Sequence, residues 1–202
     1  MKSEFDKGGY YAVTIPDQPN LRLIVLNTTL FSTIGAGKGI RQAANEQLNW
    51  LHKELEFARV KHQRVFIAMH IPPVVDVYAL LRIRLFTLVQ LWKPRYIQRF
   101  QAELKQFAPQ IAGMFSGHLH SDWYQILTFD NSNEFPFTGT TSISPIFNNN
   151  PGFKVYSYSA NLELDNFITY YYSLRDKQSW MSNSSFIYLL DVPLNYGILP
   201  RN

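Results

Sequence analysis

Three histidines lie where apolar, strand-like runs end, and this position makes them candidates for metal chemistry. His70 follows the run Arg64–Met69, while His118 and His120 follow the run Ile111–Ser116 within the sequence Gly-His-Leu-His. Neutral imidazole is the commonest protein ligand of transition metals, and a His-x-His pair brings two such nitrogens close together. We therefore predict a metal site at these three residues. A hydrogen-bonded structural histidine is the alternative at each position.

The elements that must position these histidines form an α/β pattern. A hairpin is expected over Tyr10–Ile15 and Leu21–Leu26, followed by a helix over Glu46–Val60 that Asn45 can cap. A buried strand after a helix indicates a strand–helix–strand layout, which places His70 at the carboxyl end of its strand. The second half is β-rich, with strands expected at Trp123–Phe129, Phe137–Ile143, Phe153–Tyr158 and Phe167–Ser173.

Composition excludes several other classes of protein. The chain has 202 residues, 46% of them hydrophobic, so it is long enough to bury a core. Cysteine is absent, which excludes disulfides, thiolate metal sites and cysteine nucleophiles. The net charge of +4 is spread along the chain rather than gathered in a stripe, and we expect no nucleic acid partner.

The segment 74–105 is both apolar and locally basic. Two helices with a break near Pro94 are expected in its region, over Tyr78–Ala108. A solvated helical face explains the basic residues, and contact with a membrane surface through anionic head groups is the sharper alternative. The sequence contains no run of about 18 apolar residues, so it predicts no membrane span.

The histidine motifs and several further segments resemble those of a known family. The Gly117–His120 motif, with an upstream strand ending at His70, resembles the C-terminal half of a calcineurin-like metallophosphoesterase. Further segments resemble the acid sphingomyelinase branch of that family, in family order and over about residues 8–175: Gly8–Val13, Leu21–Asn27, Gln47–Leu51, His70–Pro73 and Asn149–Tyr156.

The resemblance implies an α/β sandwich of two packed mixed sheets flanked by helices. It also implies a phosphodiesterase with two divalent ions, expected to be zinc, that share a water or hydroxide attacking phosphorus. His70 and His118 would ligate one ion, His120 would ligate the other, and Gly117 would allow a tight turn beneath them. Sphingomyelin-like or nucleotide-like phosphodiesters are the implied substrates, and the loop Asn148–Pro151 would lie near them.

The chain departs from the family pattern at its start. The family's Asp-x-His motif, its bridging Asp and its Asn-His motif, whose His protonates the leaving group, precede the segment that begins here at Gly8. The bridging Asp and the general-acid His are therefore expected upstream of Met1, and no catalytic residue is assigned within the chain. Asp76 and Asp122 are nearby carboxylates, but neither lies in a matching motif.

A half-site is the consequence of this departure. We expect the N-terminal strand–helix units of the sandwich to be missing. We also expect this chain to be inactive, or nearly so, without the missing segment or another chain.

Two domain-level expectations and one alternative function follow from this. Residues 1–175 are expected to be the C-terminal portion of a metallophosphoesterase catalytic domain, and residues 176–202 an irregular appendage. The resemblance suggests a secreted, periplasmic or lysosomal location. The alternative is a non-catalytic binding or regulatory module, or an inactive fragment, of the same fold.

Overall fold

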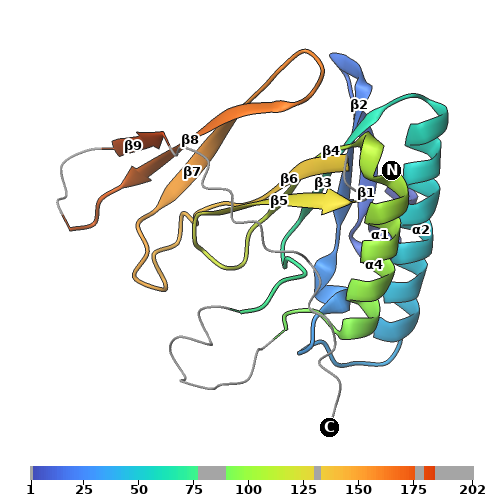
Figure 1. Cartoon of the computed structure of the whole chain (residues 1–202). Helices are drawn as coiled ribbons and strands as arrows, with labels where there is room; N and C mark the ends of the chain where they lie inside the picture. Colours follow the sequence, from blue (N-terminus) through green and yellow to red (C-terminus); the bar gives the residue numbers. More distant parts are fainter. Residues whose placement is uncertain (1, 77–89, 130–132, 176–179, 185–202) are drawn as a thin grey trace, which may run out of the picture.

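A six-stranded mixed sheet organises the chain, with its strands in the order β1-β2-β3-β4-β6-β5 (Figure 1). Its four central strands run parallel, and β1 and β5 are antiparallel to their neighbours. The computed structural model describes residues 2–76, 90–129, 133–175 and 180–184. The strands of this sheet are β1 (Tyr11–Ile15), β2 (Gln18–Leu26), β3 (Arg64–Met69), β4 (Ile111–Ser116), β5 (Trp123–Phe129) and β6 (Asn133–Gly139).

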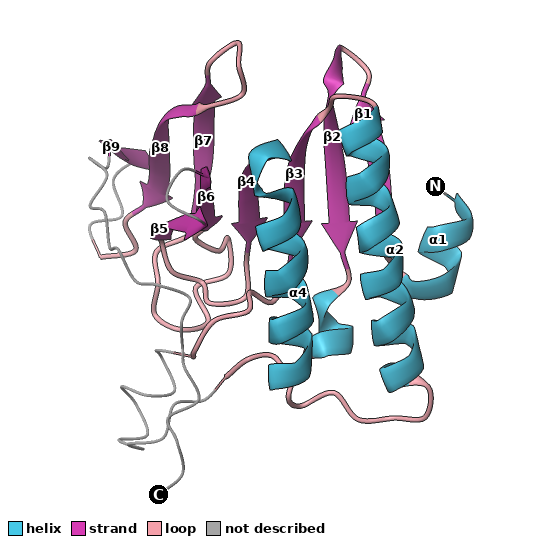
Figure 2. Cartoon of the chain, turned by 45° about the vertical axis from the view of Figure 1, so that its right-hand side comes forward, coloured by secondary structure: helices cyan, strands magenta, loops and turns pink. Residues whose placement is uncertain are grey.

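Two long helices cover one face of this sheet (Figure 2). Helix α2 (Ile40–Val60) connects β2 to β3, and its buried residues include the apolar positions that the sequence pattern predicts: Leu48, Leu51, Leu55 and Ala58. Helix α4 (Pro94–Phe107) precedes β4 and buries Tyr96, Phe100, Leu104 and Phe107. Parallel strands require crossover connections of this kind, so α2 and α4 allow β2, β3 and β4 to pair in parallel.

A second sheet packs on the opposite face, as expected for a sandwich (Figure 1). Tyr158 lies 4.9 Å from Phe66, and Tyr156 lies 5.1 Å from Phe115, measured between ring centroids. Its strands are β7 (Gly152–Tyr158), β8 (Leu164–Tyr172) and β9 (Trp180–Ser184). Both of its described pairings are antiparallel, so this sheet is not mixed in the part of the chain described.

Several element boundaries differ from the sequence predictions. Helix α2 begins six residues before the predicted Glu46, because Gly39 adopts a φ of +84° at the N-cap and allows an earlier start. A short helix, α1 (Lys2–Gly8), precedes the hairpin. Strand β6 begins at Asn133 rather than Phe137, since Pro136 is accommodated within it. The expected irregular appendage contains β9, which pairs with β8 and extends the second sheet.

The short 3-10 helices η1 (Thr28–Phe31) and η2 (Ala108–Gln110) complete the described elements. Residues 77–89, which include part of the proposed membrane-facing segment and of the first predicted helix, lie outside the described part of the chain. Among the described helices, none has the length and apolar character needed to cross a membrane.

Met1 also lies outside the described residues, which begin at Lys2. The location of the bridging Asp and of the general-acid His before Met1 stays a prediction.

Candidate metal centre

His70 is held at the end of β3 by the residue that follows it. The backbone N–H of Ile71 donates to Thr28 Oγ1 at 2.8 Å, and Trp92 Nε1 donates to the Ile71 carbonyl at 2.9 Å. Thr28 and Trp92 are both fully buried. These two hydrogen bonds fix the backbone where β3 leaves the sheet. His70 itself remains exposed at the carboxyl end of this central strand.

Replacing Thr28 by valine tests this anchor. Valine keeps the shape of the side chain but leaves the buried N–H of Ile71 without its acceptor, so the free energy of unfolding is expected to fall by about 1–3 kcal/mol. Chemical denaturation measures the loss. The exposed Thr128 on β5 provides the matched control, because Thr128→Val is expected to change stability by less than about 0.5 kcal/mol. Equal losses in both variants would contradict the anchor.

His118 and His120 lie in a strained turn after β4. The N–H of Leu119 donates to the Gly117 carbonyl at 2.8 Å, which closes a three-residue turn centred on His118. His118 has a φ of +70° and His120 a φ of +54°, both in the left-handed region that non-glycine residues avoid. The tight backbone expected at Gly117 is therefore taken by the two histidines. Gly117 instead donates its N–H to the His70 carbonyl at 3.1 Å.

The structure brings His70 and His118 together. His118 Nδ1 lies 3.4 Å from His70 Nε2, and the two rings are inclined at 80°. This separation is long for a hydrogen bond, for which about 2.7–3.2 Å is usual. Two nitrogens bound to one tetrahedral zinc ion at about 2.0–2.1 Å are about 3.3–3.4 Å apart. The spacing of the two nitrogens therefore fits two ligands of one ion.

The electrostatics of His118 suit a metal ligand. Burial lowers its pKa, the neighbouring His70 and, more weakly, His120 lower it further, and the nearby carboxylate of Asp76 opposes them. A histidine must be neutral to offer a lone pair to a metal, and a lowered pKa favours that neutral form. Asp76 is thus a carboxylate whose charge acts on His118.

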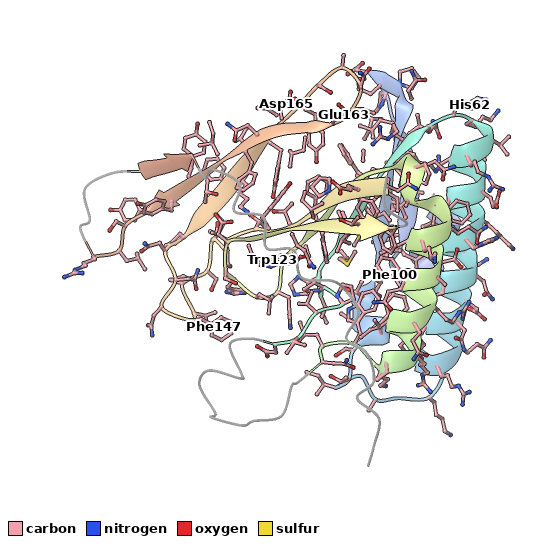
Figure 3. The ribbon with its side chains drawn as sticks, in the orientation of Figure 1. His62, Phe100, Trp123, Phe147, Glu163 and Asp165 are labelled. Atoms are coloured by element: carbon pink, nitrogen blue, oxygen red, sulfur yellow. The ribbon has the colours of Figure 1, made fainter. Side chains whose placement is uncertain are left out.

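His120 stands apart from the pair. Its ring packs at 5.0 Å from the ring of Phe147. Phe147 lies on the loop that joins β6 to β7 (Figure 3). Its Nδ1 is buried and has no hydrogen-bond partner among the described residues. The described part of the chain contains no group of three metal-ligating side chains of the kind that would enclose an ion. The assignment of His120 to a second ion stays a prediction.

Asp122, the other nearby carboxylate, is already engaged. One of its oxygens pairs with Lys154 Nζ, and the other accepts a hydrogen bond from Thr169 Oγ1 at 2.6 Å. The sequence pattern does not identify Lys154 as a site residue. Its position between Phe153 and Val155 on a β-strand indicates only that it lies on the opposite face from those two residues. The structure shows that this opposite face is the inner one.

The loop Asn148–Pro151, expected near the substrate, is organised by local contacts. In the loop Asn148–Pro151, Asn148 has a φ of +62° and Asn149 donates from Nδ2 to the Ser144 carbonyl at 3.0 Å. These contacts organise the loop that carries Phe147 to His120, and they leave its relation to a substrate a prediction. His52, on α2, lies 2.8 Å from Glu103 on α4 through its Nδ1, away from the candidate centre.

Known proteins resemble the chain over most of its length. It is 30% identical to the sphingomyelinase phosphodiesterase D of Dictyostelium discoideum in an alignment 190 residues long that covers 88% of this chain and 42% of that protein. It is 25% identical to the cyclic GMP-AMP phosphodiesterase SMPDL3A of Rattus norvegicus (86% of this chain, 39% of that protein). The corresponding identity is 28% for the acid sphingomyelinase-like phosphodiesterase 3b of Homo sapiens (84% and 38%). The chain spans about two fifths of these relatives, and no family model matches it.

Among solved structures, a dimetal phosphatase from Danio rerio matches 89% of this chain and 61% of its own, with a TM-score of 0.53 and 14% identity. The chain therefore has the calcineurin-like fold of the dimetal phosphatases. The relatives in sequence are acid sphingomyelinase-like phosphodiesterases, and the resemblance to that branch is confirmed.

Proposed function

We propose that this protein is a metal-dependent phosphodiester hydrolase and that this chain supplies one part of a dinuclear metal site. The 3.4 Å spacing of His70 Nε2 and His118 Nδ1, at the ends of adjacent parallel strands, is the observation that carries the proposal. The phosphodiesterase names of the sequence relatives support the same reaction class. Sphingomyelin-like or nucleotide-like phosphodiesters are the proposed substrates.

Each histidine has a role in this proposal. His70 and His118 hold one divalent ion, proposed to be zinc, and His120 holds the second. Two such ions, when bound, activate a water molecule and neutralise phosphate oxygens. The bridging carboxylate, the remaining ligands and the histidine that protonates the leaving group come from a segment upstream of Met1 or from another chain. A secreted, periplasmic or lysosomal location stays a prediction.

A non-catalytic module of the same fold is the second candidate. The observation that favours it is the lack of a group of three metal-ligating side chains among the described residues, because two imidazoles alone bind an ion weakly. The two candidates differ in their response to zinc. A half-site stabilises the folded chain when zinc binds, whereas a module without a metal function shows the same melting temperature with zinc and with chelator.

Metal content tests the proposal directly. After zinc reconstitution and desalting, mass spectrometry is expected to find at most about one weakly held zinc ion per chain, and calorimetric titration is expected to detect that ion. Two tightly held ions would contradict the half-site. No binding at any zinc concentration, together with an unchanged melting temperature, would favour the non-catalytic module.

A further inference from the structure

Lys154 of the second sheet makes a saturated set of polar contacts next to the histidine turn. Its Nζ donates to the Gly139 carbonyl at 2.9 Å and to Thr138 Oγ1 at 3.2 Å, and it pairs with Asp122. An ammonium group has three N–H donors, and each has an acceptor here. Nζ also lies 4.5 Å from the centroid of the Phe167 ring. The side chain is fully buried, so this charge is held by fixed partners.

Both strands of the β7–β8 pair hold the same carboxylate. Lys154 on β7 is directly opposite Thr169 on β8, and each binds a different oxygen of Asp122. The carboxylate of Asp122 favours the charged form of Lys154, whose pKa burial lowers. Removing Asp122 would leave the buried ammonium group of Lys154 without its carboxylate, which makes this contact costly to break.

Asp122 lies two residues after His120, so a contact that fixes Asp122 also restricts the backbone at His120. The turn that presents His118 and His120 has a positive φ at both, a conformation that persists only when the surroundings impose it. At its upstream end the turn is tied by the hydrogen bond from Gly117 N–H to the His70 carbonyl. At its downstream end the turn is held through Asp122, which contacts Lys154 and Thr169 of the second sheet.

We propose that Lys154 is a positioning residue that fixes the His120 imidazole through Asp122, so that the second sheet controls the geometry of the second ion site. The ion in this statement rests on the proposed function, whereas the orientation of His120 does not. Residues that orient a metal ligand without binding the metal themselves typically change metal affinity by about 10–100-fold when they are mutated.

The first test needs no metal. Nuclear magnetic resonance of the metal-free 202-residue chain follows the ring signals of its five histidines, with His120 assigned from a His120→Gln variant. Lys154→Met is expected to shift or broaden the His120 signal, because the ring loses its fixed place beside Phe147, and to leave His52 and His62 unchanged. Lys154→Arg, which keeps the charge, is expected to restore much of the wild-type signal.

The chain offers a matched control for simple loss of stability. Arg22 also forms a partly buried ion pair between two elements, donating from Nε to Glu54 at 2.9 Å, and also lies over a ring, 4.6 Å from Phe57. Arg22→Met is expected to lower the melting temperature without moving the His120 signal. If Lys154→Met does not fold, Thr169→Val removes one of the two holds on Asp122 with little change in shape and is expected to shift His120 as well.

Zinc titration of the same variants shows whether the effect is confined to His120. Because the one ion that this chain is expected to hold binds at His70 and His118, Lys154→Met and Arg22→Met are both expected to keep the wild-type zinc affinity. A wild-type His120 signal in both Lys154→Met and Thr169→Val would overturn the positioning role. Absence of zinc binding by the wild-type chain would instead count against the proposed function, and the signals of the metal-free chain would still decide the role of Lys154.

Discussion

Replacing His118 by alanine is expected to lower the affinity of the chain for zinc by more than about 100-fold. His118 Nδ1 and His70 Nε2 are the two nitrogens whose 3.4 Å spacing fits one ion, and loss of either leaves a single imidazole. Mutating a residue that merely supports a ligand already costs about 10–100-fold, so removal of the ligand itself costs more. Calorimetric zinc titration of the wild-type chain and the variant measures the ratio.

Comparison among the histidines makes this prediction specific. His70→Ala is expected to lose the same ion as His118→Ala, and the double variant is expected to be little worse than either single variant, because the two residues share one ligand function. The control is His52→Ala, which removes a half-exposed imidazole paired with Glu103 on α4. Wild-type zinc affinity in His118→Ala, or an equal loss in His52→Ala, would contradict the shared site.

The strand ends were the part of the site that sequence alone could predict. Buried parallel strands are short apolar runs, and the first polar residue after such a run lies at the sheet edge. This reasoning placed His70 and His118 at the ends of β3 and β4, which pair in parallel and bring the two residues together. Neither the spacing of 3.4 Å nor the positive φ of His118 follows from residue types.

Lys154 shows why the remainder could not be predicted. Charged residues on strands usually face solvent, and the sequence gives no sign that Asp122, 32 positions earlier, is the partner. The fold makes the same point at Pro136, because a proline normally argues against a central strand. Pro136 is tolerated in β6, where the pairing with β4 begins only at Phe137. In both cases the tertiary neighbour decides the outcome.

Alanine at Gly139 is expected to destabilise the chain by about 3 kcal/mol or more. A Cβ at this position of β6 would lie 1.8 Å from Trp123 Nε1 and 2.4 Å from two further atoms of the same ring, distances that require movement. Trp123, labelled in Figure 3, cannot swing away freely. Its ring packs edge-on against the buried Phe137, with centroids 4.8 Å apart. Overpacking a core costs about 1–3 kcal/mol and more where nothing can shift. Chemical denaturation measures the change.

Two comparisons separate this clash from a general effect of losing a glycine. Gly39, with a φ of +84° and open space around it, has only the conformational cost, so Gly39→Ala is expected to lose about 1–2 kcal/mol. In a Trp123→Leu background the clashing ring is gone, and Gly139→Ala is expected to cost far less than in the wild type, with a coupling of at least about 1 kcal/mol. The same loss in both backgrounds would mean that the indole ring does not set the requirement for glycine. Because Lys154 donates to the Gly139 carbonyl, a shift of β6 caused by the clash would also reach the contact that holds Asp122.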